Sequence, residues 1–143
     1  MKKVADILAR KNRHLVSVVP NTTVLDALKI MSDHNIGSIL VIDSDGQYNG
    51  ILTERDYARK VILKGKSSTD TRVHDIMSTD LPRISPDSTI DECMQLMSAN
   101  NIRYLPVFNN NYLVGIISVN DVIKAVIANQ EETISHLQSY IHS

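Results

Sequence analysis

Two segments of the chain repeat apolar residues at the three- and four-residue spacing of an amphipathic helix. Their apolar positions are Val24, Ala27, Leu28 and Met31 in the first segment and Ile90, Cys93, Met94 and Met97 in the second. A threonine precedes each segment, Thr23 or Thr89, and an acidic residue follows it three positions later, as in a helix-capping box. The pattern predicts two helices of the same design, with the methionines and the cysteine in the core.

Each predicted helix is followed by two runs with the character of β-strands. The first run of each pair is almost continuously apolar, which is typical of a strand covered on both faces. A polar turn leads into the second run, so each pair is expected to form a hairpin. A further helix is expected to begin near Glu54 and near Val119. The expected strands are residues 38–42 and 48–53 in the first half and 104–108 and 112–118 in the second.

These elements recur because the sequence is duplicated. Residues Pro20–Asp43 align without a gap with Pro86–Asn109, and a lead-in phrase opens each copy, at Val4–Leu8 and again at Val73–Met77. A unit this small rarely buries its own core, so the two copies are expected to pack together and to form two related clefts. The predicted organisation is one β-α-β-β-α repeat at 1–65, a second at 66–128 and a C-terminal helical extension at 129–143.

The end of the chain, residues 121–141, is expected to form one long helix. Its apolar residues fall on alternating three- and four-residue steps, interrupted at Gln130. The stripe consists of Ile123, Ile127, Ile134, Leu137 and Ile141. Two interpretations stay open, namely packing onto its own module or association with a second copy or another partner.

Composition narrows the function classes. The chain has 143 residues, 43% of them hydrophobic, and a net charge of −1 without any basic run, which argues against nucleic-acid binding. No apolar stretch approaches the roughly 20 residues that cross a bilayer, which argues against a membrane protein. The N-terminus has no apolar signal region, and the single cysteine cannot form an internal disulfide. A cytoplasmic location is therefore expected.

One motif carries candidate chemistry, and it occurs in both copies. A strand ends with a glycine, two apolar residues and then Thr53 or Ser118, and an aspartate, Asp56 or Asp121, follows three residues later at a helix start. The hydroxyl and the free N–H groups of the first helical turn suit a phosphate, and the carboxylate can accept hydrogen bonds from both hydroxyls of a ribose. The same spacing also describes an ordinary capping box. The preceding glycine-led strand favours the nucleotide interpretation.

Other chemistry finds little support. The histidines are scattered without metal-ligand spacing, and no nucleotide-binding glycine loop or nucleophile elbow is present. We therefore expect no catalytic residues, no metal and no catalytic cofactor.

The chain resembles a tandem pair of cystathionine β-synthase (CBS) domains, also called a Bateman module. The resemblance rests on residues 50–56, 84–86 and 102–107 and on the paired lead-ins, and the C-terminal tail is similar to that of small stand-alone proteins of this family. It implies an α/β (α+β) fold in which two β-α-β-β-α repeats pack sheet to sheet around a pseudo-two-fold axis. It also implies adenosine-containing ligands in the clefts between the repeats, and association of two modules into a homodimer.

The family resemblance assigns roles to particular positions. Asp56 and Asp121 would hold ribose hydroxyls, and Thr53 and Ser118 would lie near phosphate. The remaining expected ligand-binding residues are Ser17, Val18, Arg83 and Ile84 along the adenine base, Ser38, Leu40, Tyr104 and Pro106 on the apolar wall, and Arg55, Arg103 and Asn120 nearby. Because the two copies differ at the last three of these, their sites are not expected to bind equally.

The function that these observations favour is a non-enzymatic regulatory module. It would bind AMP, ADP or ATP and signal occupancy to a separate effector enzyme or transporter. The alternatives are a ligand-free dimerisation scaffold, and a binder of NAD(H) or S-adenosylmethionine.

Overall fold

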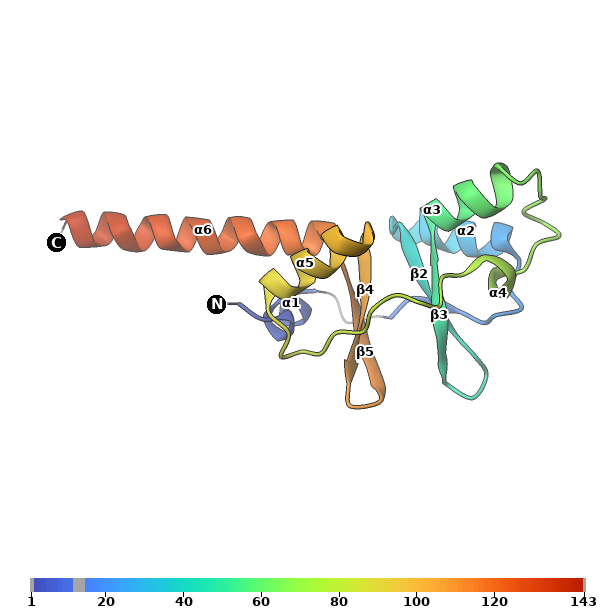
Figure 1. The fold of residues 1–143 in the computed structure, drawn as a ribbon, viewed down its shortest axis with the longest axis horizontal. Helices are drawn as coiled ribbons and strands as arrows, with labels where there is room; N and C mark the ends of the chain where they lie inside the picture. Colours follow the sequence, from blue (N-terminus) through green and yellow to red (C-terminus); the bar gives the residue numbers. More distant parts are fainter. Residues whose placement is uncertain (1, 12–14, 143) are drawn as a thin grey trace. The chain divides into compact units, whose positions relative to one another are not determined.

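The computed structural model describes residues 2–11 and 15–142 and has a mixed α+β fold (Figure 1). The chain divides into two compact units. The first-repeat unit is His14–Leu81, and the second-repeat unit combines Met1–Arg13 with Pro82–Ser143. Each unit is described by itself below.

The first-repeat unit is built on a three-stranded sheet in the order β1-β2-β3. Strand β1 runs parallel to β2, and β2 pairs antiparallel with β3, so that Ser38 lies opposite Thr53. The elements are β1 (Ser17–Val18), α2 (Val24–His34), β2 (Ser38–Ile42), β3 (Tyr48–Thr53), α3 (Glu54–Tyr57), the π-helical turn η1 (Ala58–Ile62) and α4 (Val73–Ile76).

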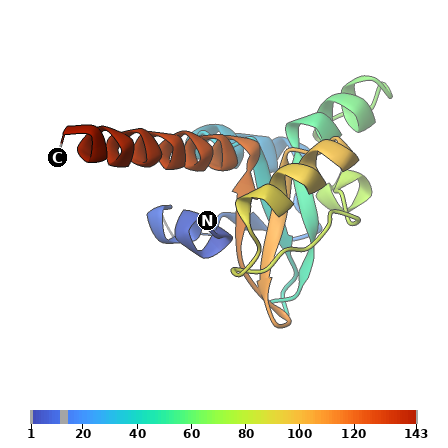
Figure 2. The ribbon, with the colours of Figure 1, turned by 60° about the vertical axis from the view of Figure 1, so that its left-hand side comes forward.

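The second-repeat unit repeats this plan with a two-stranded sheet. Strands β4 and β5 form an antiparallel hairpin, and the position of β1 is taken by a single parallel bridge between Ile84 and Val107. The elements are α1 (Val4–Arg10), α5 (Ile90–Asn100), β4 (Tyr104–Asn109), β5 (Tyr112–Ser118) and α6 (Val119–His142). Figure 2 shows α6 extending past α1 and α5 of its own unit.

The predicted helix caps are confirmed. The Thr23 hydroxyl accepts from the Asp26 N–H at 3.2 Å, and the Thr89 hydroxyl accepts from the Glu92 N–H at 3.1 Å. Each helix then ends at an asparagine in the left-handed conformation, with φ of 53°. The local sequence therefore fixes both ends of these helices.

Each unit has its own apolar core. Helix α2 packs Val24, Ala27 and Met31 against its sheet, and α5 packs Ile90, Cys93 and Met97 against β4 and β5. Met94 differs from expectation, because 40% of its surface is exposed and it lies outside the core. Burial, with a smaller effect of Glu92, raises the pKa of the Cys93 thiol to about 11, so this group stays protonated at neutral pH.

The two lead-in helices are exchanged between the repeats. Helix α1 docks on the second repeat through N–H bonds from Val4 to the Ser88 carbonyl and from Ala5 to the Pro86 carbonyl, both 2.9 Å. Helix α4 docks on the first repeat, where the Val73 N–H bonds to the Thr22 carbonyl at 2.9 Å. Each compact unit therefore contains the lead-in of the other sequence repeat. The boundaries 1–65, 66–128 and 129–143 stay a prediction about the duplicated sequence.

Candidate functional site

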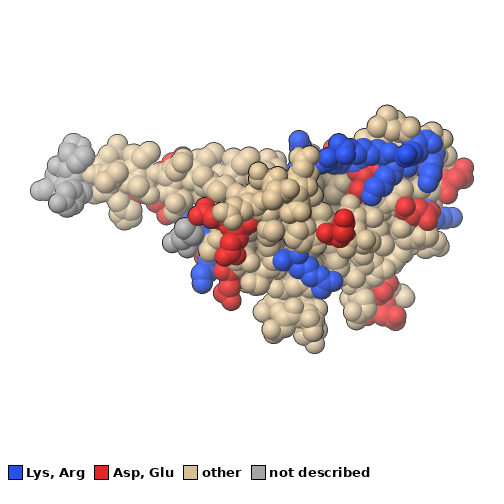
Figure 3. Space-filling view, in the orientation of Figure 1, with Lys and Arg blue, Asp and Glu red and all other residues tan. Residues whose placement is uncertain are grey.

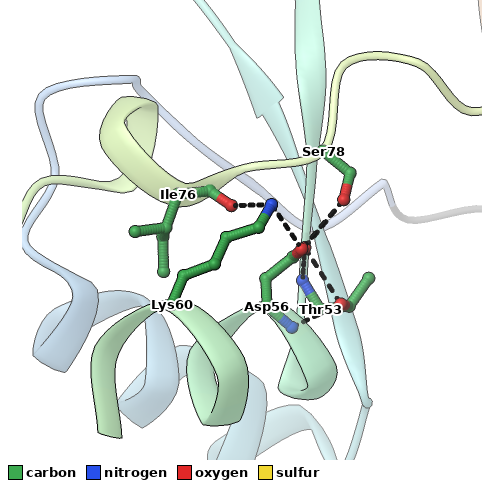
Figure 4. Close-up of polar contacts among 5 residues, drawn as sticks. All are labelled: Thr53, Asp56, Lys60, Ile76 and Ser78. Carbon is green, nitrogen blue, oxygen red and sulfur yellow. Dashed lines mark hydrogen bonds and ion pairs between the residues drawn. The ribbon is translucent and has the colours of Figure 1, made fainter. Parts of the chain in front are cut away.

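The first motif lies at the junction of β3 and α3 (Figure 4). The Asp56 Oδ2 atom accepts from the Thr53 N–H at 3.0 Å and from the Thr53 hydroxyl at 2.9 Å. In return, the Asp56 N–H donates to the Thr53 hydroxyl oxygen at 3.0 Å. The motif is thus a complete capping box that begins α3.

Two further side chains hold the Asp56 carboxylate. The Lys60 Nζ atom lies 3.0 Å from Asp56 Oδ1 and also donates to the Ile76 carbonyl at 3.0 Å. The Ser78 hydroxyl, from the chain just after α4, lies 2.9 Å from Oδ1 and 3.1 Å from Oδ2. Asp56 is only 6% exposed, so its charge depends on these donors rather than on water.

The second motif has the same cap and a different cation. The Ser118 N–H donates to Asp121 Oδ2 at 2.8 Å, and the Asp121 N–H donates to the Ser118 hydroxyl at 3.2 Å. Lys11, just after α1, places its Nζ atom 2.7 Å from the same Oδ2 and 2.9 Å from the Ile116 carbonyl. Among the described residues, the donors to Asp121 use Oδ2 and none donates to Oδ1.

The two repeats therefore neutralise their aspartates differently. The duplicated alignment places Ala125 at the position of Lys60, and the aligned lead-ins place Ala9 at the position of Ser78. Sequence reasoning did not include Lys11, Lys60 or Ser78 in the site. Lys60 could have been found, because it follows Asp56 by one helical turn. Lys11 and Ser78 arrive from lead-ins, and their placement requires the exchange described above.

The glycine that begins each motif has a packing role. A Cβ atom at Gly50 would lie 2.6 Å from the Ser78 carbonyl oxygen, and one at Gly115 would lie 2.8 Å from a Leu8 methyl carbon. Each glycine thus admits a lead-in against the strand, and at Gly50 this close approach positions Ser78 beside Asp56. The glycine before each motif favoured the nucleotide interpretation over a simple helix cap in the sequence, and this packing explains why a glycine is there.

The strand register separates the other expected residues into two faces. Cross-strand partners share a face and successive residues alternate, so Ser17, Ser38, Leu40 and Thr53 lie on one face of their sheet. By the same rule Tyr104, Pro106 and Ser118 share one face of the β4–β5 hairpin. The opposite faces carry the apolar cores.

Six expected residues are placed differently. Val18 and Ile84, 7% and 6% exposed, belong to the cores rather than to the shared faces. The Arg83 guanidinium lies 4.1 Å from the centre of the Phe108 ring. Arg55 and Asn120 are exposed in the first turns of α3 and α6. Arg103 is exposed just before β4, and its carbonyl accepts from the Val119 N–H at 2.9 Å.

Asp121 also lines a cavity of about 310 Å³ in the second-repeat unit. Basic side chains outnumber acidic ones in its lining, which suits an anionic group. The lining residues are Lys2, Asp6, Ile7, Arg10, Lys11, Asp121, Lys124 and Ala125.

Comparison with known proteins defines the class. The family model of the CBS domain matches the chain twice, over residues 4–63 and 73–128. The chain therefore belongs to the CBS domain family and contains a pair of these domains. Proteins made only of such a pair are regulatory modules rather than catalysts, and CBS domains often bind adenosine nucleotides.

Three similar proteins illustrate the match. The mitochondrial CBS domain-containing protein CBSX3 of Arabidopsis thaliana is 41% identical over 123 residues, 83% of this chain and 60% of that protein. The CBS domain-containing protein YhcV of Bacillus subtilis is 33% identical over 130 residues, 91% of this chain and 89% of that one. A solved structure of a protein with CBS domains from Burkholderia ambifaria has 45% identity and a TM-score of 0.86, covering 90% of this chain and 96% of its own.

The residues that the structure describes contain no helix with the length and apolarity needed to cross a membrane. Within the same residues, His, Cys, Asp and Glu side chains do not gather in groups of three or more that could hold a metal ion.

Proposed function

We propose that this chain is a regulatory module that binds an adenine nucleotide, AMP, ADP or ATP, and signals occupancy to a separate effector enzyme or transporter. The observation that carries the proposal is the paired arrangement of Asp56 and Asp121. Each lies where a strand meets a helix and bonds to the last strand residue, Thr53 or Ser118, whose sheet face the helical core does not use. Each aspartate is also held by a lysine. A ribose diol could occupy this position by donating hydrogen bonds from its hydroxyls to the carboxylate.

Of the two motifs, the second, at Asp121, is expected to bind the nucleotide first. Asp121 Oδ1 can accept a ribose hydroxyl without loss of a bond to any described residue, and the adjoining cavity presents Arg10, Lys11 and Lys124 to phosphate. Asp56 has protein donors on both oxygens, so a ligand there must replace Ser78 or Lys60. Unequal affinity of the two motifs follows from this difference.

Release of Lys11 or Ser78 from its aspartate by a bound nucleotide would also supply a conformational signal. Lys11 and Ser78 lie on the two segments that lead from one compact unit into the other along the chain. A phosphate that draws Lys11 away from Asp121, or a ligand hydroxyl that replaces Ser78 at Asp56, changes what holds the end of that segment. Its differential affinity for the held and released arrangements is then the free energy available for signalling, about 1–3 kcal/mol in typical allosteric proteins.

Thermal unfolding with AMP, ADP, ATP, NADH or S-adenosylmethionine tests the proposal. A ligand at 100 times its dissociation constant adds about 2.7 kcal/mol of stability. Asp121→Asn is expected to remove most of this gain and Asp56→Asn less of it, whereas Asp26→Asn, another acid in a first helical turn, leaves it unchanged. No stabilisation by AMP, ADP or ATP overturns the proposal, and a shift with NADH or S-adenosylmethionine alone moves the ligand to that class.

A ligand-free scaffold is the second candidate. The observation in its favour is that both aspartates already complete capping boxes and ion pairs within their own units. This function predicts no stability shift with any of these nucleotides and unchanged self-association in the Asp56→Asn/Asp121→Asn double variant. The homodimer and the cytoplasmic location remain parts of the proposal.

A further inference from the structure

The second half of α6 lies away from the rest of its unit (Figures 1 and 2). Every residue from Asn129 to Ser139 is exposed. Among the described residues, the side-chain link from this stretch to another element is the ion pair between Glu132 and Lys2, with Oε1 and Nζ 3.1 Å apart. A helical segment of this length is marginal in water without packing on one face. Its stability therefore calls for a partner.

The exposed apolar residues of α6 follow a heptad repeat. Ile127 and Ile134 occupy a positions, and Ile123, Gln130 and Leu137 occupy d positions. The isoleucines and the leucine are 49–58% exposed, which is unusual for such large apolar side chains in one row. The sequence continues the pattern with Ile141 at the next a position. This is the spacing of a coiled-coil seam rather than of a helix that packs on a sheet.

The seam continues into a groove at the base of the helix. An apolar cavity of about 350 Å³ lies between α5 and α6, and its lining includes Met94, Met97, Ile102, Ile123 and Ile127. The visible face of the projecting part of α6 is largely uncharged in Figure 3. One apolar surface, which we call the α6 seam (Met94, Ile123, Ile127, Ile134 and Leu137), thus runs from the groove along the helix.

The composition of the seam identifies its occupant. In the projecting part of the helix, Ile134 at a and Leu137 at d form the combination that favours two parallel helices. In a parallel, in-register pair, Gln130 meets Gln130 of the second copy, and the two amides can hydrogen-bond to each other. In an antiparallel pair centred on this stretch, Gln130 would lie against Ile134 of the second copy and lose its partner.

The neighbouring positions agree with this arrangement. Parallel pairing sets Val126 beside Glu131 of the other copy, and Thr133 beside Gln138, so no like charges meet. We propose that α6 forms a parallel, in-register coiled coil with α6 of a second copy through the α6 seam. This inference does not depend on nucleotide binding.

Two double variants of the full chain test the seam. Ile134→Asp/Leu137→Asp introduces two charges on the seam, and Ser135→Asp/Ser139→Asp introduces the same charges on the other side of the helix. Sedimentation equilibrium is expected to show association weakened about a hundredfold or more by the first pair and unchanged by the second. Equal association of both variants overturns the proposal, as does a monomeric wild-type chain at all concentrations. Circular dichroism of the globular elements confirms that both variants are folded.

Cross-linking tests the orientation. Gln130→Cys is expected to give a disulfide-linked dimer under mild oxidation, because in-register d positions face each other, whereas Ser135→Cys is expected to remain unlinked. Cys93 is buried and does not compete. Efficient linkage only in a mixture of Gln130→Cys and Ile134→Cys chains would indicate antiparallel helices and overturn the assigned orientation.

Discussion

Substitution of Gly50 by alanine tests the link between the motif glycine and the lead-in segment. The added Cβ would lie 2.6 Å from the Ser78 carbonyl oxygen and 3.2 Å from the Met77 sulfur. The carbonyl oxygen belongs to the backbone, which cannot rotate away as a side chain does. The segment after α4 must therefore move off β3.

The cost follows from the bonds that this movement breaks. The Ile51 N–H donates to the Ser78 carbonyl at 3.0 Å, and the Ser78 N–H donates to the Ile51 carbonyl at 2.8 Å. Each bond contributes about 1 kcal/mol, and overpacking adds about 1–3 kcal/mol. Displacement of Ser78 also removes donors from the buried Asp56. We expect Gly50→Ala to lower the free energy of unfolding by about 3–5 kcal/mol.

Gly115→Ala is the matched control. Its Cβ would meet a Leu8 methyl carbon at 2.8 Å, and that methyl lies at the end of a flexible side chain. Rotation of Leu8 can relieve this contact, so a loss of about 1 kcal/mol or less is expected. Urea unfolding of both variants, followed by circular dichroism, measures the difference. Equal losses, or a larger loss for Gly115→Ala, would refute the assignment of Gly50 to backbone packing.

Three further predictions concern charged and titratable groups. Lys60→Met leaves the carboxylate of Asp56 without its cation. Because Lys60 is half exposed, the free energy of unfolding is expected to fall by only about 1–3 kcal/mol. Urea unfolding measures this loss, and Lys64→Met, at an exposed position, is the control that should show no change. Hydrogen bonds from the Gln47 N–H and the Asn49 amide hold the pKa of Asp43 below its usual 3.8, so its contribution is present above that pH and disappears as the pH falls through the lower folded value. Asp43→Ala should therefore destabilise the chain at pH 7 and have no effect in strong acid, and an equal effect at both would contradict the role of the ionised form. The Cys93 thiol, with its pKa raised to about 11, should react with a thiol reagent at pH 8 only as fast as the chain unfolds, so labelling within seconds in the native protein would contradict its burial.

Local signals in the sequence were sufficient for the helices and hairpins. The caps at Thr23 and Thr89 bond to groups three residues away, so a short window of sequence contains the whole interaction. The long C-terminal helix is confirmed as α6, because a heptad spacing is also a local property. The family assignment is confirmed for the same reason, since its motifs are short phrases around strand ends.

The lead-in side chains that contact the two motif aspartates come from distant parts of the chain, so local sequence signals could not predict them. Lys11 and Asp121 are 110 residues apart, and neither repeat reveals which lead-in docks on it. One part of the site could have been sharpened from the sequence. Successive residues of a strand face opposite sides, so the side chains of Ser17 and Val18 could not both line the adenine base, and the structure places Val18 in the core. The same reasoning applies to Arg83 and Ile84.

Divergence of the two copies has physical consequences for the proposed function. In the first repeat the aspartate takes its cation from its own helix, through Lys60, and a neutral hydroxyl from the lead-in, through Ser78. In the second repeat the cation itself comes from the lead-in, through Lys11, and the helix supplies an alanine. A phosphate that draws Lys11 away from Asp121 would therefore release a charged group on the segment that continues into the first-repeat unit, whereas a ligand that replaces Ser78 at Asp56 can leave the ion pair with Lys60 intact. Under the proposed function, the duplicated fold thus contains one motif suited to transmitting occupancy along the chain and one suited to holding its own unit together.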